Sequence, residues 1–190
     1  TAFARNYIQD LIKKAEKEGF KVVYGDTDSV FLLLGDKQVK DAKRFTEEVN
    51  KDLPGMMELE YEDHFKRGIF VETKSGKGGA KKKYALISED DKIKITGFET
   101  VRRNWSPIAK KTQKDVIKIL LKENNPKKAL NYIRSVINDL KDHTIDVKEV
   151  LISTQLQKDI DDYVQVGPHV AVAKRMKAKG DFVGLGMTIE

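Results

Sequence analysis

The stretch that most constrains this chain is an acidic one, Tyr-Gly-Asp-Thr-Asp-Ser at positions 24–29, which lies between two apolar runs. Residues 22–24 before it and 30–34 after it are rich in β-branched, aromatic and aliphatic types, which favour strands. Glycine and aspartate tolerate the backbone of tight turns. The pattern therefore predicts a β-hairpin whose tip carries Asp26 and Asp28, one residue apart.

Two carboxylates at this spacing can reach one cation, and Mg²⁺ is commonly held by one or two carboxylates plus substrate phosphates. A calcium-binding EF-hand loop beginning at Asp26 is excluded, because its sixth position is Phe31 instead of Gly and its twelfth is Lys37 instead of Glu. Ordinary turn chemistry and the metal-binding Asp-x-Asp pair of glycosyltransferases both fit the two aspartates taken alone.

Helices and further strands flank the predicted hairpin. Apolar residues at helical spacing predict a helix over 2–18, which Gly19 ends, and a second helix over 39–53. Strands are expected at residues 59–62, 68–73, 83–87 and 93–96. The order indicates an α+β fold in which helices cover one face of an antiparallel sheet.

A basic segment at residues 74–83 contains five lysines and no acid. Its glycines do not match the spacing of a phosphate-binding P-loop. We expect Lys81, Lys82 and Lys83 to enter a strand that projects lysines alternately to both faces, where they can contact phosphates. A solvated basic loop is the alternative.

The composition agrees with a polyanionic partner without requiring one. The 36 Lys and Arg residues exceed the 30 Asp and Glu residues, for a net charge of +6. The 35% charged content fits a heat-adapted surface equally well. The absence of cysteine excludes a disulfide framework and a thiolate metal site. Apolar runs only of strand length predict no membrane span, and we expect no secretory signal.

The second half of the sequence predicts helices. Ser106 and Pro107 suit the start of a helix that reaches Glu123 and carries a stripe of lysines four residues apart. A helix after Asn125 has an apolar stripe that we expect to face a core, and Gly167-Pro168 begins a last helix. We expect Trp105 to be a packing anchor, and the apolar residues between 145 and 152 to anchor an irregular segment.

The motifs together resemble those of family B DNA polymerases, and they occur in that family's order. The string at 24–29 resembles the third polymerase motif, and Lys-Lys-Tyr-Ala at 82–85 resembles the segment that holds the primer terminus. Residues 97–105 are similar to the crossing from palm to thumb, and Gly-Pro-His-Val-Ala-Val-Ala at 167–173 is similar to a thumb signature. The resemblance implies the end of a palm domain over 1–104 and a mainly helical thumb over 105–190.

The resemblance also implies roles for single residues. Asp28 would bind the two catalytic Mg²⁺ ions, with Asp26 in a lesser role close to the metals. The residues expected to contact DNA are Lys81, Lys82, Lys83 and Tyr84 on the primer strand, and His169, Lys174 and Arg175 in the thumb.

Two motifs of the family are missing from these residues: the first palm motif, with the other metal-binding aspartate, and the Lys-x-x-x-Asn-Ser-x-Tyr-Gly motif, which grips the nucleotide. Thr1-Ala2-Phe3 resembles the point just after that second motif. Two-metal catalysis needs carboxylates from both palm motifs. We therefore expect the chain to be inactive alone.

The expected partners are a larger polymerase chain with the other palm motifs, fingers and exonuclease, together with primer-template DNA and dNTP. We expect the protein in the cytoplasm, at the nucleoid. The chain resembles the small subunit of a split archaeal polymerase, and a fragment of a single-chain enzyme is the competing interpretation. The alternatives of other classes are a noncatalytic duplex-binding module and a fragment of an Asp-x-Asp glycosyltransferase.

Overall fold

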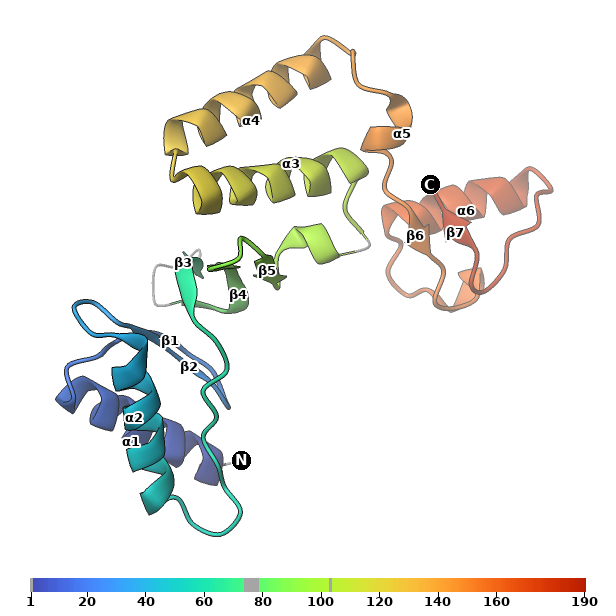
Figure 1. Ribbon diagram of the computed structural model, residues 1–190. Helices are drawn as coiled ribbons and strands as arrows, with labels where there is room; N and C mark the ends of the chain where they lie inside the picture. Colours follow the sequence, from blue (N-terminus) through green and yellow to red (C-terminus); the bar gives the residue numbers. More distant parts are fainter. Residues whose placement is uncertain (1, 74–78, 103) are drawn as a thin grey trace. The chain divides into compact units, whose positions relative to one another are not determined.

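The computed structural model describes residues 2–73, 79–102 and 104–190, and it divides into two compact units, 1–96 and 97–190 (Figure 1). The division falls between Thr96 and Gly97, whereas the sequence suggested a boundary after Asn104. Half of the basic, glycine-rich segment at 74–83, namely residues 74–78, lies outside the described residues. The naming of the two units as palm and thumb stays a prediction.

The first unit combines two helices with two antiparallel sheets, as an α+β fold requires. Its helices and strands are α1 (Ala2–Lys17), β1 (Lys21–Gly25), β2 (Val30–Leu33), α2 (Val39–Asp52), β3 (Phe65–Glu72), β4 (Gly79–Ser88) and β5 (Ile93–Thr96). Strands β1 and β2 form the expected hairpin, and β3, β4 and β5 form a three-stranded sheet in that order. Gly19 follows α1 with φ +81°, a left-handed conformation that suits a residue without a side chain.

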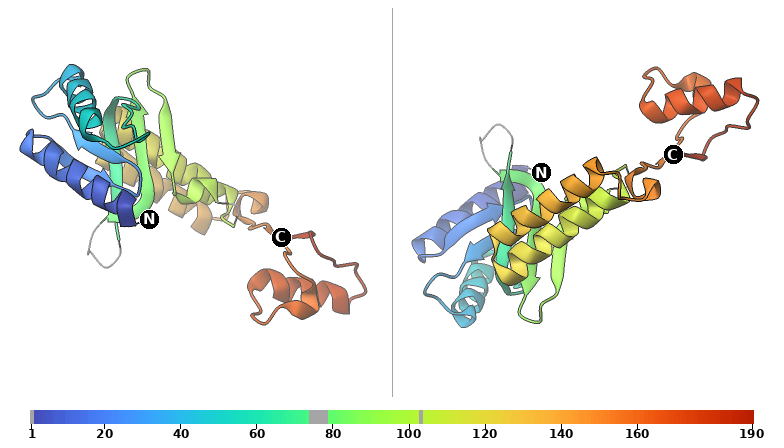
Figure 2. Two further views of the ribbon diagram at one scale, coloured as in Figure 1. Left: turned by 90° about the horizontal axis from the view of Figure 1, so that it is seen from below. Right: turned by 90° about the horizontal axis from the view of Figure 1, so that it is seen from above.

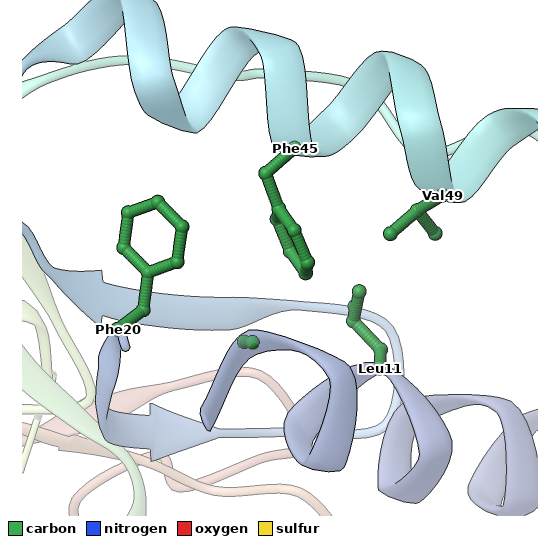
Figure 3. Packing of buried hydrophobic residues seen from close by; sticks show 5 residues of the cluster. Leu11, Phe20, Phe45 and Val49 are labelled. Carbon is green, nitrogen blue, oxygen red and sulfur yellow. The ribbon is translucent and has the colours of Figure 1, made fainter. Parts of the chain in front are cut away.

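Both helices pack on one face of the β1–β2 hairpin, as expected. Figure 3 shows Phe45 and Val49 of α2 pointing towards Leu11 of α1 and towards Phe20, and all four side chains are buried. The rings of Phe20 and Phe45 lie 5.4 Å apart between centroids. Apolar residues of the hairpin complete this core, namely Val22, Val30, Leu32 and the adjoining Leu34. The hairpin therefore has a rigid support behind it.

The strand expected at 59–62 is wrong, because this segment is irregular. The side chain of Asn50 on α2 holds its backbone: Nδ2 donates to the Leu59 carbonyl at 2.9 Å, and Oδ1 accepts from the Leu59 N–H at 2.7 Å. These bonds occupy groups that a strand partner would need. The alternating pattern instead places Leu59 against the core and Tyr61 beneath the Lys43 ammonium, 5.3 Å from the ring centroid.

The second unit is mainly helical. It contains η1 (Glu99–Val101), α3 (Pro107–Lys118), η2 (Ile119–Glu123), α4 (Pro126–Lys141), α5 (Val147–Val150), β6 (Thr154–Gln155), η3 (Ile160–Asp162), α6 (Pro168–Ala178) and β7 (Thr188–Ile189). Helices α3 and α4 lie side by side (Figures 1 and 2). Proline occupies the first turn of α3, α4 and α6, as the sequence predicted.

The apolar stripe of α4 is only partly buried, which corrects the expectation of a core-facing stripe. Ala129 and Val136 are buried, whereas Leu130, Ile137 and Leu140 are 46%, 44% and 39% exposed. A helix that packs against one neighbouring helix covers only a narrow stripe of its surface, so the outer apolar positions stay in contact with solvent. Trp105 is likewise 42% exposed, and Val147 and Ile152 do not anchor their segment, because both side chains are exposed.

Candidate active site

A β-bulge in β1 decides which way the hairpin presents its side chains. Val22 pairs with Leu32 and Tyr24 with Phe31, so Val23 is an extra residue in β1. In a regular strand, Val22 and Tyr24 would face the same side. The bulge instead lets Val22 join the core beneath the helices while Tyr24 and Phe31 face the other way.

Tyr24 and Phe31 pack against the three-stranded sheet through two aromatic residues, Phe70 of β3 and Tyr84 of β4. The Tyr24 ring stacks on Phe70 with centroids 5.6 Å apart and planes at 25°, and it lies 5.6 Å from Tyr84. Phe31 lies 5.2 Å from Tyr84 and 5.6 Å from Phe70. These separations are typical of favourable aromatic pairs, so the cluster fixes the hairpin against the segment that carries the lysines.

The two aspartates at the hairpin tip have different surroundings. The backbone N–H of Asp26 donates to the Ser29 carbonyl at 2.9 Å, which closes the turn. Asp26 Oδ1 accepts from the Thr27 backbone N–H at 2.8 Å and from Thr27 Oγ1 at 3.2 Å, and its side chain is only 14% exposed. Asp28 is exposed. Asp26 is thus held by the turn, while Asp28 is open to a ligand.

The lysine segment lies beside this tip, but not as a regular strand. The register passes from Phe70–Tyr84 to Glu72–Gly79, so residues 80–83 of β4 oppose a single residue of β3. Lys82 has φ +54°, which is uncommon for a residue with a side chain. The expectation of lysines alternating between two faces is therefore wrong, since the left-handed residue breaks the alternation.

Lys82 makes two contacts with the hairpin. Its backbone N–H donates to Tyr24 Oη at 2.6 Å, and its Nζ lies 3.9 Å from Asp26 Oδ2. The Lys81 side chain is exposed and Lys83 is half-buried. Four residues expected in the site, Asp26, Asp28, Lys82 and Tyr84, thus belong to adjoining segments of one unit. Tyr24 received no role from the sequence, although it is the first residue of the motif.

The other expected DNA-binding residues lie in the second unit, on α6. His169 is half-buried, and its ring meets Tyr163 edge-on at 5.9 Å between centroids. Lys174 and Arg175 are exposed in the later turns of the helix. They are available to an anionic ligand.

Asp26 and Asp28 fit Mg²⁺ by donor chemistry, since carboxylate oxygens are its preferred protein ligands. Over residues 2–73, 79–102 and 104–190, no three Asp, Glu, His or Cys side chains gather closely enough to hold a metal ion by themselves.

Comparison with known proteins identifies the family. The sequence profile described as DNA polymerase family B matches residues 2–189. This chain belongs to DNA polymerase family B.

Two relatives show how much of a family B polymerase the chain represents. It is 43% identical to a DNA polymerase of Methanocaldococcus jannaschii over 98% of this chain and 11% of the relative. It is 41% identical to a DNA polymerase of Thermococcus gorgonarius over its full length and 24% of that protein. The chain therefore spans a quarter or less of these polymerases.

A solved structure of the family supports the fold. The family B DNA polymerase from the hyperthermophilic archaeon Pyrobaculum calidifontis matches with a TM-score of 0.70 and 33% identity, over 99% of this chain and 23% of that one. No helix in the described part of the chain is long and apolar enough to cross a membrane.

Proposed function

We propose that the chain supplies the metal-binding hairpin, the primer-gripping segment and the duplex-binding thumb of a DNA-directed DNA polymerase. The observation that carries the proposal is the 3.9 Å approach of Lys82 Nζ to Asp26 Oδ2 at the hairpin tip. Acidic groups suited to a divalent cation thus adjoin a lysine segment suited to phosphates. Nucleotidyl transfer needs both kinds of group at one place, and the chain's relatives are DNA polymerases.

Each site residue has a proposed role. Asp28, the more exposed carboxylate, binds the two Mg²⁺ ions, and Asp26 adds negative charge beside them. Bound Mg²⁺ stabilises the charge that develops on phosphoryl oxygens. Lys81, Lys82, Lys83 and Tyr84 hold the primer strand, and His169, Lys174 and Arg175 follow the backbone of the duplex.

The resemblance implies a further metal-binding aspartate in the first palm motif, so Asp26 and Asp28 would supply half of a two-metal site. We infer that the remaining palm motifs complete the polymerase site. These motifs, the fingers and the exonuclease belong to the rest of the enzyme. The assembled polymerase acts in the cytoplasm, at the nucleoid. The primer-template and dNTP bind to that complete assembly. Primer extension by the rigorously pure 190-residue chain would refute this inference.

Capture of the chain from its source organism tests the proposal and identifies the enzyme's organisation. The tagged chain is expressed at a low level and captured from an extract of the organism. The proteins that elute with it are identified, and the eluate is assayed for Mg²⁺-dependent primer extension. A larger partner bearing the missing motifs, together with activity, would establish a split polymerase. Discovery of the same residues within a longer active polypeptide would establish a single-chain enzyme instead. An eluate without polymerase activity in either form would contradict the proposed function.

Replacement of both Lys82 and Lys83 by Ala should make primer-template binding less sensitive to salt. Each lost phosphate contact is expected to reduce the slope of log affinity against log salt by about 0.9, because fewer counterions are released. The slope is measured by fluorescence anisotropy of the assembled enzyme. A matched control, Lys17→Ala with Lys40→Ala, removes the same charge from exposed positions of α1 and α2. An equal change in both variants would return the lysine segment to the interpretation of a solvated loop.

A further inference from the structure

The hydroxyl of Tyr24, a member of the aromatic cluster, accepts a hydrogen bond of 2.6 Å from the Lys82 backbone N–H. The ring that carries it has little freedom, since Phe31, Phe70 and Tyr84 all lie within 6 Å of it between centroids. A hydroxyl on a ring fixed in this way offers an acceptor at a defined point. Lys82 is 58 positions away along the sequence, so the bond joins two separate segments.

The Lys82 backbone has a conformation that needs such support. Its φ of +54° brings the Cβ close to its own backbone and is disfavoured for lysine. Such conformations persist where surrounding contacts enforce them, and they concentrate at functional sites. The bulge at 80–83 departs from the regular ladder with β3, so the Tyr24 hydroxyl supplies an acceptor where that ladder is interrupted.

The direction of the Lys82 side chain depends on this backbone conformation. With Lys82 in the left-handed region, its Nζ lies 3.9 Å from Asp26 Oδ2, although the lysine side chain is 71% exposed and has ample room elsewhere. A lysine in regular extended backbone would follow the alternation of β4. The ammonium thus lies beside the hairpin tip in a lysine whose backbone is left-handed and whose N–H is bonded to the Tyr24 hydroxyl.

We propose that Tyr24 is a positioning residue: its hydroxyl fixes the left-handed conformation of Lys82 and so directs the Lys82 ammonium to the primer phosphate nearest the Asp26–Asp28 tip. The inference rests on the proposed function, because it concerns how the same site is assembled. What it adds to the proposed function is a hydrogen bond that links the metal-binding hairpin to the primer-gripping segment.

The first test is amide hydrogen exchange on the 190-residue chain without DNA, comparing Tyr24→Phe with the unmodified protein. The substitution keeps the ring and removes only the acceptor. Exchange of the Lys82 amide should quicken by about two- to tenfold, the factor that corresponds to one ordinary hydrogen bond. Tyr61→Phe is the matched control, because it removes a hydroxyl from a ring beside α2 and should leave the Lys82 amide unchanged. Unaltered exchange in Tyr24→Phe would overturn the inference and leave the proposed function standing.

The second test measures primer-template KM and kcat in the assembled enzyme. Tyr24→Phe should raise KM for primer-template by about two- to tenfold and change kcat less, because the loss concerns the placement of a phosphate-binding group. In a Lys82→Ala background the same substitution should have no further effect, since the two residues act through one ammonium. Fully additive effects would show that Tyr24 acts independently of Lys82, and would overturn the positioning role. If Lys82→Ala leaves primer binding unchanged, the proposed role of Lys82 itself fails, and with it the positioning role of Tyr24.

Discussion

Replacement of Asp28 by Asn should abolish nucleotide incorporation by the assembled polymerase while leaving its affinity for duplex DNA largely intact. Asparagine has nearly the same shape but lacks the negative charge that a divalent cation requires. Metal ions contribute several kcal/mol to the transition state, so the rate should fall by about 10³-fold or more. Asp28 is exposed at the hairpin tip, so the substitution should not disturb the fold. Single-nucleotide incorporation under single-turnover conditions measures the effect.

A matched variant separates this effect from a general loss of surface charge. Asp36→Asn makes the same change at an exposed turn after β2, and it should retain full activity. Near-normal turnover of Asp28→Asn would remove Asp28 from the site. A noncatalytic duplex-binding module would bind DNA equally well in both variants without any Mg²⁺-dependent extension by the unmodified assembly. A glycosyltransferase would bind a nucleotide diphosphate sugar instead of primer-template.

The hairpin and its supporting helices could be predicted because local signals agree there. The residue types around positions 24–29 favour two strands and a tight turn, and the spacing in α1 and α2 matches the helical period. What the local pattern does not contain is the bulge at Val23. An extra residue in a strand depends on which side chains the rest of the fold accepts on each face, and here it turns Tyr24 away from the helices.

The backbone conformation of the lysine segment could not be predicted from its sequence either. Charge alone indicates a phosphate-binding segment, and alternation is the natural expectation for lysines in a strand. Lys82 has a left-handed backbone, and its N–H is bonded to the hydroxyl of Tyr24, a residue distant in the sequence. A contact of this kind leaves no periodic signal. The motif at 24–29 includes Tyr24 and Asp26, the two residues that contact Lys82, but its sequence does not indicate these contacts.

In the helical unit, the sequence predicted the helices correctly but not how deeply their apolar side chains are buried. The apolar stripe of α4 correctly predicts a helix, since periodicity depends on the chain itself. How much of the stripe is covered depends on how many neighbours the helix has, and Leu130 and Ile137 remain partly exposed. In the first unit, the alternation around Leu59 suggested a strand, but the Leu59 N–H and carbonyl are bonded to the Asn50 side chain instead of a neighbouring strand.

Replacement of Phe45 by Ala should destabilise the first unit by about 3 to 5 kcal/mol, the usual cost of removing a buried phenylalanine. Phe45 is 6% exposed and packs on Phe20, so the truncation leaves a cavity between α2 and the hairpin. Domains of ordinary size have stabilities of about 5 to 15 kcal/mol, so the loss is a large part of the total. Amide exchange in β1 and β2 measures it.

Phe182→Ala is the control for the Phe45 substitution, because Phe182 is 87% exposed and its truncation should change stability by less than about 0.5 kcal/mol. The single tryptophan, Trp105, belongs to the second unit, so its fluorescence reports that unit separately. In Phe45→Ala, we expect faster exchange in the hairpin with an unchanged fluorescence transition. An equal shift of both signals would mean that the two units unfold together. If hairpin exchange and the fluorescence transition both change only slightly, the core closes around the missing ring. The hairpin tip would then not depend on Phe45 for its support.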